Sequence, residues 1–278
     1  MKTVLVVANE TLGGKQLLER ARQLKAEEPD LRLVVCVPRS RPRHGNVIYD
    51  DAVFQAAQIR IDLARQVLRS NGIEAIGEVG DPDPYTAALD AIAEHNPDEV
   101  IVSTFPATTS GWLRRDLVDR IRDSAGVPVE HIVSDIDAEG LPFRVTLVVA
   151  NRTANSPGLL PALKRHATEQ EPHLFIVMVP QEGGEGIDGQ RAAARLAQLI
   201  DRMRAEGMLV AGMIGPPDPY VATMNALQFF RFDDVVISTL PESSSRWLRT
   251  DLVERVRKGT PVPVEHVVSE AATTPAAA

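Results

Sequence analysis

The chain has 278 residues, of which 44% are hydrophobic, and this is enough apolar content for a folded protein of about two domains. Its net charge of −8 comes from interleaved acidic and basic residues, which argues against nucleic acid and anionic membranes as partners. Cys36 is the single cysteine, so we predict neither a disulfide nor a cysteine-based metal site, and expect a small core residue in a reducing cytoplasm.

The chain begins with MKTVLVVANE, whose apolar run of about five residues is too short for a signal peptide and predicts a first strand. Short β-branched runs then alternate with longer amphipathic stretches, a pattern typical of βαβ units and a parallel sheet. The predicted strands lie at 3–8, 32–37, 73–79, 99–103 and 128–133. The predicted helices lie at 14–27, 51–70, 84–95 and 112–124. In such an open sheet the ligand site lies at the carboxyl ends of the strands, so the loops after strands one, two and four are expected to meet.

The chain also repeats itself. VVAN at 6–9 returns at 148–151, and VPVEHIVS at 127–134 returns as VPVEHVVS at 262–269. These matches predict a tandem duplication of an α/β domain with an open five-stranded parallel sheet. The predicted boundaries are a first domain at 1–134, a linker at 135–143, a second domain at 144–270 and a disordered tail at 271–278.

The junction between strand four and the next helix is likewise built twice, as STFPATTSGW at 103–112 and STLPESSSRW at 238–247. In a structural interpretation, it contains N-cap serines, tryptophans that anchor the helix to the core and aspartates that complement the helix dipole: Ser110, Ser245, Trp112, Trp247, Asp116 and Asp251. In a functional interpretation, the hydroxyls line a crevice and Arg114 and Arg249 supply positive charge. Both interpretations can hold at once.

Other motifs favour structural roles. In GDPDPY and GPPDPY, Asp83 and Asp218 are expected to cap helices that start with proline. His131 and His266 alternate with glutamates on the last strands, and we expect them to pack in the sheet rather than bind metal. No catalytic signature is complete, so no catalytic residue and no metal ligand is predicted.

The five-stranded repeats, the terminal VPVEH strand and the loop after strand four together resemble tandem universal stress proteins, in the Rossmann-like, adenine nucleotide alpha hydrolase-like group. The resemblance covers nearly the whole chain. It implies a non-enzymatic binding or regulatory protein with one crevice per repeat and ATP or AMP as the ligand. In nucleotide-binding members an Asp after strand one recognises the adenosine side, and a G-x-x-G then G-S/T pattern after strand four cradles the phosphates.

Carried onto this chain, the resemblance implies twelve cofactor-binding positions: Asn9, Val37, Pro38, Ser103, Thr104, Pro106, Ser110, Asn151, Val179, Ser238, Thr239 and Ser245. The chain departs from the family pattern, since asparagines replace the Asp, Ser-x-x-Pro replaces the two glycines, and Asp116 and Asp251 fall close to the G-S/T position. Proline lacks an amide donor, so we predict that ATP binds weakly or not at all.

Two alternatives stay open: a purely structural dimerisation protein whose crevices are closed by the prolines, and an enzyme of the broader group. For assembly, we predict that strand 128–133 pairs antiparallel with 263–268, within one chain or between two, because both repeats end in the same apolar strand.

Overall fold

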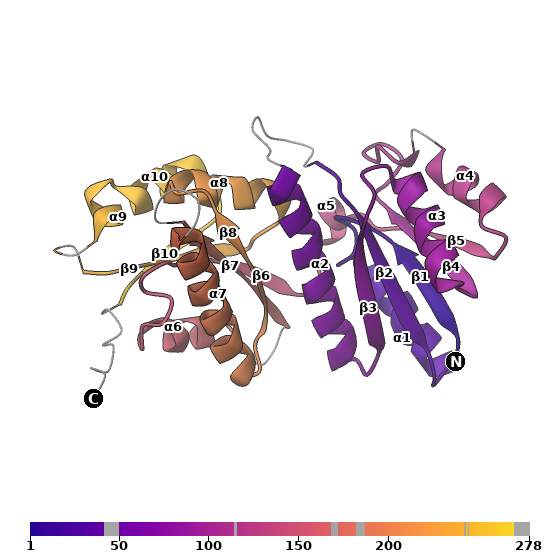
Figure 1. Ribbon diagram of the computed structural model, residues 1–278, viewed down its shortest axis with the longest axis horizontal. Helices are drawn as coiled ribbons and strands as arrows, with labels where there is room; N and C mark the ends of the chain where they lie inside the picture. The colour runs from indigo at the N-terminus through magenta and orange to yellow at the C-terminus, as the bar shows by residue number, and fades with distance from the viewer. Residues whose placement is uncertain are drawn as a thin grey trace. The chain divides into compact units, whose positions relative to one another are not determined.

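The computed structural model of the chain describes residues 1–41, 50–113, 116–167, 172–181, 187–241, 243 and 245–269. The chain divides into two compact units: unit 1 ends at Pro142 and unit 2 begins at Phe143. Each unit contains its own five-stranded sheet with helices on both faces (Figure 1). The predicted fold class, a tandem pair of Rossmann-like α/β units, is confirmed.

Unit 1 has the strand order β3-β2-β1-β4-β5, and every neighbouring pair is parallel. Its elements are β1 (Thr3–Val7), α1 (Lys15–Glu27), β2 (Arg32–Pro38), α2 (Asp50–Ser70), β3 (Glu74–Gly80), α3 (Pro84–His95), β4 (Glu99–Thr104), α4 (Leu117–Ser124), β5 (Val129–Val133) and α5 (Ile136–Glu139). The short α5 lies inside the segment predicted as a linker, where the side chain of Asp135 caps it by accepting from the Ala138 amide.

Unit 2 has the order β10-β9-β6-β7-β8, which is the same topology read from the other edge. Its elements are β6 (Arg144–Val149), α6 (Leu159–His166), β7 (His173–Pro180), α7 (Ile187–Ala205), β8 (Leu209–Gly215), α8 (Pro219–Phe229), β9 (Asp234–Thr239), α9 (Arg246–Arg249), α10 (Leu252–Gly259) and β10 (Val264–Val268). The register is also shared, since Cys36 pairs with Glu78 in unit 1 and Met178 with Met213 in unit 2.

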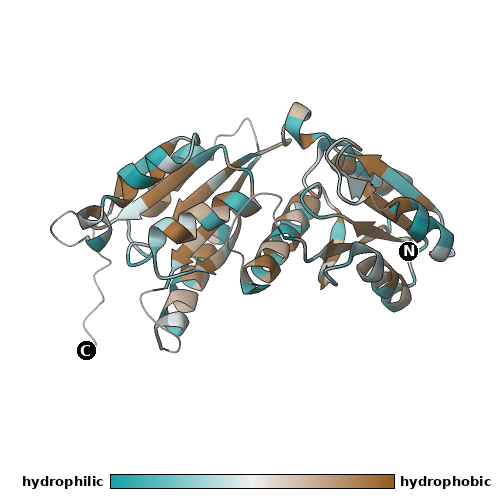
Figure 2. Ribbon diagram, turned by 90° about the horizontal axis from the view of Figure 1, so that it is seen from above, coloured by the Kyte–Doolittle hydropathy of each residue, from teal (hydrophilic) through white to brown (hydrophobic). Residues whose placement is uncertain are grey.

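The core follows the two-residue period of the strands. In unit 1, Val4 and Val6 pack with α1 and α2 on one face of the sheet. Leu5 and Val7 pack with α3 and α4 on the other face. Figure 2 shows the strands largely hydrophobic and the helices with mixed hydropathy, as expected for a sheet covered on both sides by amphipathic helices. The carboxyl edge of each sheet is thereby left to the loops.

The helix after strand four starts later than predicted. We predicted a helix over 112–124, but α4 begins at Leu117 because Asp116 adopts a left-handed backbone conformation, with φ of 49°. Asp251 has the same φ at the start of α10. A left-handed non-glycine residue costs about 1–2 kcal/mol and interrupts a right-handed helix. Neither aspartate makes a side-chain cap hydrogen bond, so the predicted complementation of the helix dipole does not take the form of a cap.

Among the described residues, no helix combines the length and the apolar character needed to cross a membrane. Three sequence predictions concern parts outside the described residues: Arg114, the side chain of Arg249 and the tail at 271–278.

Candidate functional site

Side chains after the first strand of each unit tie the loops at the carboxyl edge together. In unit 1, the Asn9 amide nitrogen donates to the Pro38 carbonyl at 3.0 Å, and the Thr11 hydroxyl donates to the Ser103 carbonyl at 3.0 Å. The loops after β1, β2 and β4 therefore meet as predicted. Unit 2 repeats both bonds, at 2.9 and 3.0 Å, with Asn151, Pro180, Thr153 and Ser238.

Unit 2 has a cavity of about 460 Å³ at this edge, which we call the unit 2 cavity. It lies at the loops that follow β6 and β9, neighbouring strands at which the strand order reverses, where open α/β sheets bind ligands. Its volume is within the range of small-molecule sites. It is lined by Asn151, Arg152, Thr153, Gln181, Pro217, Pro219, Ser238, Thr239, Leu240, Ser245, Arg246, Trp247 and Thr250. Among the residues that the structure describes, this lining includes two arginines and no acidic side chain, which favours an anion.

The threonine hydroxyls predicted to bind a ligand are used inside the protein. The Thr104 hydroxyl donates to the Phe105 carbonyl at 2.9 Å and lies 2.9 Å from His131 Nε2. Because the hydroxyl has one proton, the second bond requires Nε2 to donate. Unit 2 has the same arrangement, with the second distance at 2.8 Å, in Thr239, Leu240 and His266. The prediction that His131 and His266 pack in the sheet is confirmed.

The serines before these threonines are buried too. The Ser103 and Ser134 hydroxyls lie 3.4 Å apart, and the Ser238 hydroxyl donates to that of Ser269 at the same distance. Ser238 and Thr239 line the unit 2 cavity but are only 1% and 2% exposed, so they offer a ligand little surface.

The loop after strand four is closed by a proline carbonyl and a serine cap. The Pro106 carbonyl accepts from the Ser110 amide at 2.8 Å, and the Ser110 hydroxyl accepts from the Leu113 amide at 3.2 Å. In unit 2, the corresponding distances are 2.9 and 3.2 Å, with Pro241, Ser245 and Leu248. The predicted serine caps are confirmed, although each caps a short turn rather than the long helix.

The two tryptophans, Trp112 and Trp247, occupy equivalent positions of the repeat. Trp112 is half-buried and packs against the core formed with α3 and α4. Trp247 is half-buried as well, but it lines the unit 2 cavity. The prediction that Trp112 anchors the core is confirmed, whereas for Trp247, which lines the unit 2 cavity, the same role stays a prediction.

Two predicted positions face away from the site. Val37 and Val179 are fully buried, and both pack in the core beneath the helices that cover that face of their sheet. Their side chains are therefore core residues. Pro38 is buried and contributes its carbonyl to Asn9.

The charges at the carboxyl edge differ between the units. Glu10 of unit 1 corresponds to Arg152 of unit 2, and Gly111 corresponds to Arg246. Burial lowers the pKa of Arg60 to about 10, an effect that the negative charge of Glu10 opposes. Unit 1 thus has an acid that acts on its partly buried Arg60, whereas unit 2 adds positive charge to its cavity.

Asn9 and Asn151, which follow the first strand of each unit, also differ in the hydrogen bonds that their side chains make. In unit 2, Arg195, which corresponds to Arg60, donates to the Asn151 side-chain oxygen. In unit 1, the Asn9 side-chain oxygen is buried without a hydrogen-bond partner among the described residues. Among the described residues, the asparagine side chain after the first strand therefore makes one more hydrogen bond in unit 2 than in unit 1.

Two further sequence predictions are confirmed. Asp83 and Asp218 cap α3 and α8, whose first residues are prolines; the Asp83 carboxylate accepts from the Thr86 amide at 3.1 Å. Cys36 is buried, and burial, with a smaller effect of Glu78, raises the pKa of its thiol to about 12. A thiol with this pKa is a core group rather than a nucleophile.

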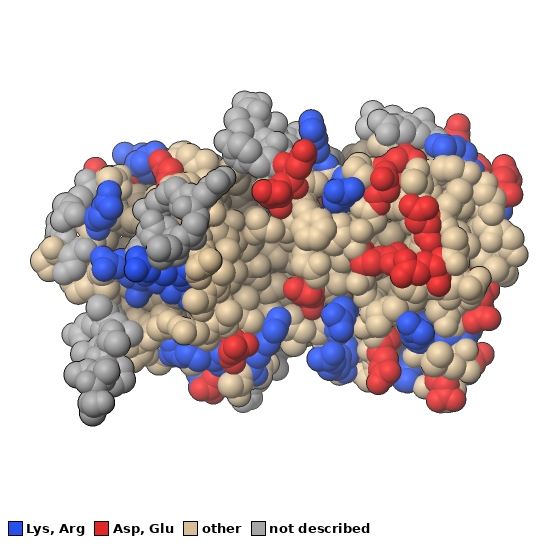
Figure 3. Space-filling model, in the orientation of Figure 1, with Lys and Arg blue, Asp and Glu red and all other residues tan. Residues whose placement is uncertain are grey.

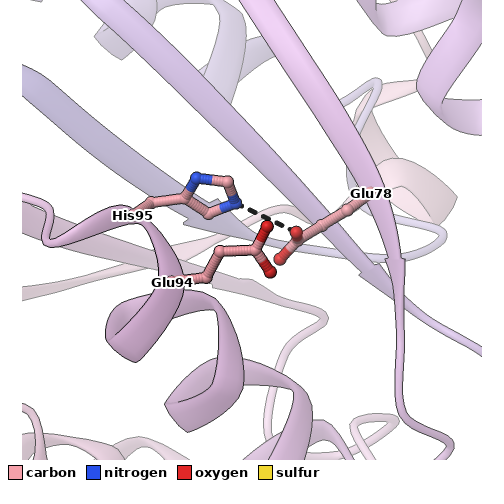
Figure 4. A group of neighbouring side chains, drawn as sticks. All are labelled: Glu78, Glu94 and His95. Atoms are coloured by element: carbon pink, nitrogen blue, oxygen red, sulfur yellow. Dashed lines mark hydrogen bonds and ion pairs between the residues drawn. The ribbon is translucent and has the colours of Figure 1, made fainter.

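One polar cluster was missed by the sequence analysis, which predicted no metal site. Glu78, Glu94 and His95, here called the β3–α3 cluster, point toward one another from β3 and the last turn of α3 (Figure 4). One ligand atom from each residue lies within 4.8 Å of the others. A comparison of the two repeats could have pointed to this cluster, because Glu94 and His95 of unit 1 correspond to the apolar Phe229 and Phe230 of unit 2.

Fold and site together define a pair of Rossmann-like units with a ligand-sized cavity at the switch point of unit 2.

No protein-family model matches the chain, and the search of curated proteins gives no match. Among solved structures, the chain is similar to a universal stress protein from Archaeoglobus fulgidus, with 16% identity, 96% of each chain covered and a TM-score of 0.35.

The chain is also similar to a universal stress protein family protein from Arabidopsis thaliana with AMP bound, at 13% identity and a TM-score of 0.32, over 50% of this chain and 95% of that one. A third similar structure is a functionally unknown protein from Pseudomonas aeruginosa, at 17% identity and a TM-score of 0.32, over 97% and 93% of the two chains. At these identities and TM-scores we draw nothing about function from the similarity.

Proposed function

We propose that the chain is a non-enzymatic binding protein of the universal stress protein type, in which the unit 2 cavity binds an adenine mononucleotide such as AMP. The observation that carries this proposal is the lining of the cavity, whose described residues include Arg152, Arg246 and Trp247 and no acidic side chain. Guanidinium groups form paired, charge-assisted hydrogen bonds with phosphate. An indole ring offers an apolar face on which a base can stack.

The same lining supports binding rather than catalysis. Its described residues include no Asp, Glu, His, Cys or Lys, the side chains that most often act as general acid, general base or nucleophile. The Ser245 hydroxyl, which also lines the cavity, accepts from the Leu248 amide and caps a turn. Incubation of the protein with AMP or ATP is expected to leave both unchanged by chromatography, and stoichiometric turnover would contradict this part of the proposal.

Binding is expected to be weak. Pro241 has no amide to donate to a phosphate, and the Ser238 and Thr239 hydroxyls are hydrogen-bonded within unit 2. Such a site has to rely on its arginines and on stacking. We therefore expect a dissociation constant well above about 1 μM, a value that corresponds to roughly −8 kcal/mol.

Calorimetric titration with AMP tests the proposal. Arg246→Gly and Arg152→Glu place the residues of unit 1 in unit 2, and both sites are exposed, so the fold should be retained. Each change should weaken AMP binding at least about tenfold, since a hydrogen bond to a charged group contributes about 1.5–3 kcal/mol. Arg257→Ala is the control, because Arg257 pairs with Glu254 on α10 and is not part of the lining. Unchanged affinity in both cavity variants, or no binding at millimolar AMP, would contradict the proposal.

A second candidate function, self-association, is favoured by the edge strands. β5 and β10 lie at the edges of their sheets, where each is hydrogen-bonded to one neighbour in its own unit. Val133 and Val268, at equivalent positions of these strands, are 44% and 56% exposed. An apolar strand edge of this kind is a template for pairing. We propose that the two strands pair antiparallel, within one chain or between two.

Amide hydrogen exchange distinguishes antiparallel pairing of β5 and β10 from strand edges that are exposed to solvent. The β5 and β10 amides that point away from β4 and β9 should be protected, and Val133→Lys together with Val268→Lys should remove that protection. Free exchange of these amides in the unmodified protein would show that the edges are unpaired.

A further inference from the structure

Outside the unit 2 cavity, the β3–α3 cluster brings two carboxylates and an imidazole together in unit 1. His95 Nε2 lies 3.0 Å from a carboxylate oxygen of Glu78, and the third residue, Glu94, places an oxygen within 4.8 Å of both. Glu78 and His95 are partly buried, whereas Glu94 is exposed. The group is therefore held by the fold and open to an ion from solvent.

The fold itself places these side chains together. Glu78 pairs in register with Cys36, whose sulfur contacts the Ala87 carbonyl of α3, so Glu78 is on the side of the sheet that α3 covers. α3 ends at Asn96, which has a φ of 44° and stops the helix directly after Glu94 and His95. The carboxyl end of a helix has a partial negative charge, which adds to that of the two glutamates and favours a cation.

An ordinary ion pair accounts for only part of the cluster. A pair between His95 and Glu78 explains their 3.0 Å contact, but it leaves the Glu94 carboxylate beside the Glu78 carboxylate. Two like charges in a partly buried site repel each other unless a cation lies between them. Figure 3 shows acidic side chains gathered on the part of unit 1 where β3 and α3 lie.

Unit 2 shows that the scaffold does not need polar residues here. The positions of Glu78, Glu94 and His95 are occupied there by Met213, Phe229 and Phe230. Met213 and Phe229 are buried, so the same space is filled by apolar side chains. A donor set present in one unit and absent from the other at matched positions is hard to explain by packing alone.

We propose that Glu78, Glu94 and His95 bind a divalent first-row transition-metal ion, with Zn²⁺ as the probe. Zn²⁺ takes His nitrogen and carboxylate oxygen ligands at about 2.0–2.2 Å, usually in tetrahedral geometry, so three protein ligands leave one position for water. Ligand atoms of such a site lie about 3.4 Å apart. The separations in the β3–α3 cluster, from 3.0 Å to at most 4.8 Å, reach this value with small side-chain movements.

Calorimetric titration of the full chain with Zn²⁺ tests the proposal. We expect one ion per chain at this site, and Glu94→Gln should weaken its binding at least about tenfold. Because Glu94 is exposed, this variant should fold normally, as thermal unfolding can verify. His95→Phe, which introduces the unit 2 residue, should abolish binding at the site.

A matched control exists in unit 2. His166 also lies between two carboxylates, with Nε2 at 2.7 Å from Glu265 and Nδ1 at 3.6 Å from Asp234. His166→Gln should leave the Zn²⁺ affinity of the β3–α3 cluster unchanged. X-ray absorption of the loaded protein should show one imidazole among oxygen ligands. Equal Zn²⁺ affinity in Glu94→Gln and unmodified protein, or loss of the ion in His166→Gln instead of His95→Phe, would overturn the assignment.

Discussion

At one register position of the sheet, Cys36 faces Glu78 in unit 1, and Met178 faces Met213 in unit 2. At the carboxyl edge, an asparagine follows the first strand of each unit. The next residue is Glu10 in unit 1 and Arg152 in unit 2. Each substitution changes charge or polarity without changing the strand order or the register. The comparison teaches that, after duplication, individual side chains diverged in charge and polarity while the strand order and register were retained.

The retained framework consists of short polar contacts as well as the core. Both units use an asparagine, a threonine and a serine at the same places to hold the carboxyl-edge loops, with bond lengths that agree within 0.1 Å. Both also have a left-handed aspartate with φ of 49°, which precedes α4 in unit 1 and α10 in unit 2. The sites that differ between the units are therefore held by the same backbone framework and the same loop hydrogen bonds.

The largest loss of stability is expected from substitutions in the core, to which the two units should respond alike. Leu5 and Leu147 occupy equivalent positions in the first strand of each unit, and both are fully buried. Leu5→Ala and Leu147→Ala should each destabilise the affected unit by about 2–5 kcal/mol, the range for removal of a buried leucine side chain. Urea denaturation measures this, and Trp112 and Trp247 report on units 1 and 2 in single-tryptophan variants. A cost below about 1 kcal/mol in either unit would break the claim of a shared framework.

A smaller and unequal effect is expected at the asparagines. Asn151 bonds both Pro180 and Arg195, whereas the Asn9 oxygen has no partner among the described residues. Asn151→Ala should therefore cost about 2 kcal/mol and Asn9→Ala about 1 kcal/mol, as each lost hydrogen bond contributes roughly 1 kcal/mol. The same denaturation experiment compares the two, and a greater loss for Asn9→Ala would contradict the difference we describe between the loops.

The smallest expected effect is the contribution of two histidines to the loss of folding stability at acid pH. Burial lowers the pKa of His131 and of His266, and Arg122 and Arg257 act in the same direction. A folded-state pKa below the unfolded value of about 6.5 means that the unfolded chain binds protons first, so stability falls as pH drops below about 6.5. His131→Gln and His266→Gln should each flatten this loss in their own unit. Unfolding temperatures between pH 7.5 and 5 measure it, and equal slopes in variant and parent would contradict the assignment.

Periodicity and duplication were sufficient to predict both sheets, since strands near 3–8 and 99–103 stand out as β-branched runs and return in the second repeat. Asp83 and Asp218 were predictable as caps because capping depends on neighbouring residues only. The break at Asp116 was not, because left-handed aspartate has no local signature. The β3–α3 cluster was missed for a similar reason: Glu78 and His95 are separated in sequence and meet only when α3 packs on β3.

The location of nucleotide binding can be measured directly, because Trp112 and Trp247 are the only tryptophans in the sequence. In Trp112→Phe, all indole emission comes from Trp247, which lines the unit 2 cavity, and in Trp247→Phe it comes from Trp112 of unit 1. Titration with AMP should change the emission of Trp112→Phe with the affinity found by calorimetry and leave that of Trp247→Phe unchanged. A saturable change that appears only in Trp247→Phe would place the nucleotide in unit 1 and contradict the proposed division of function between the two units.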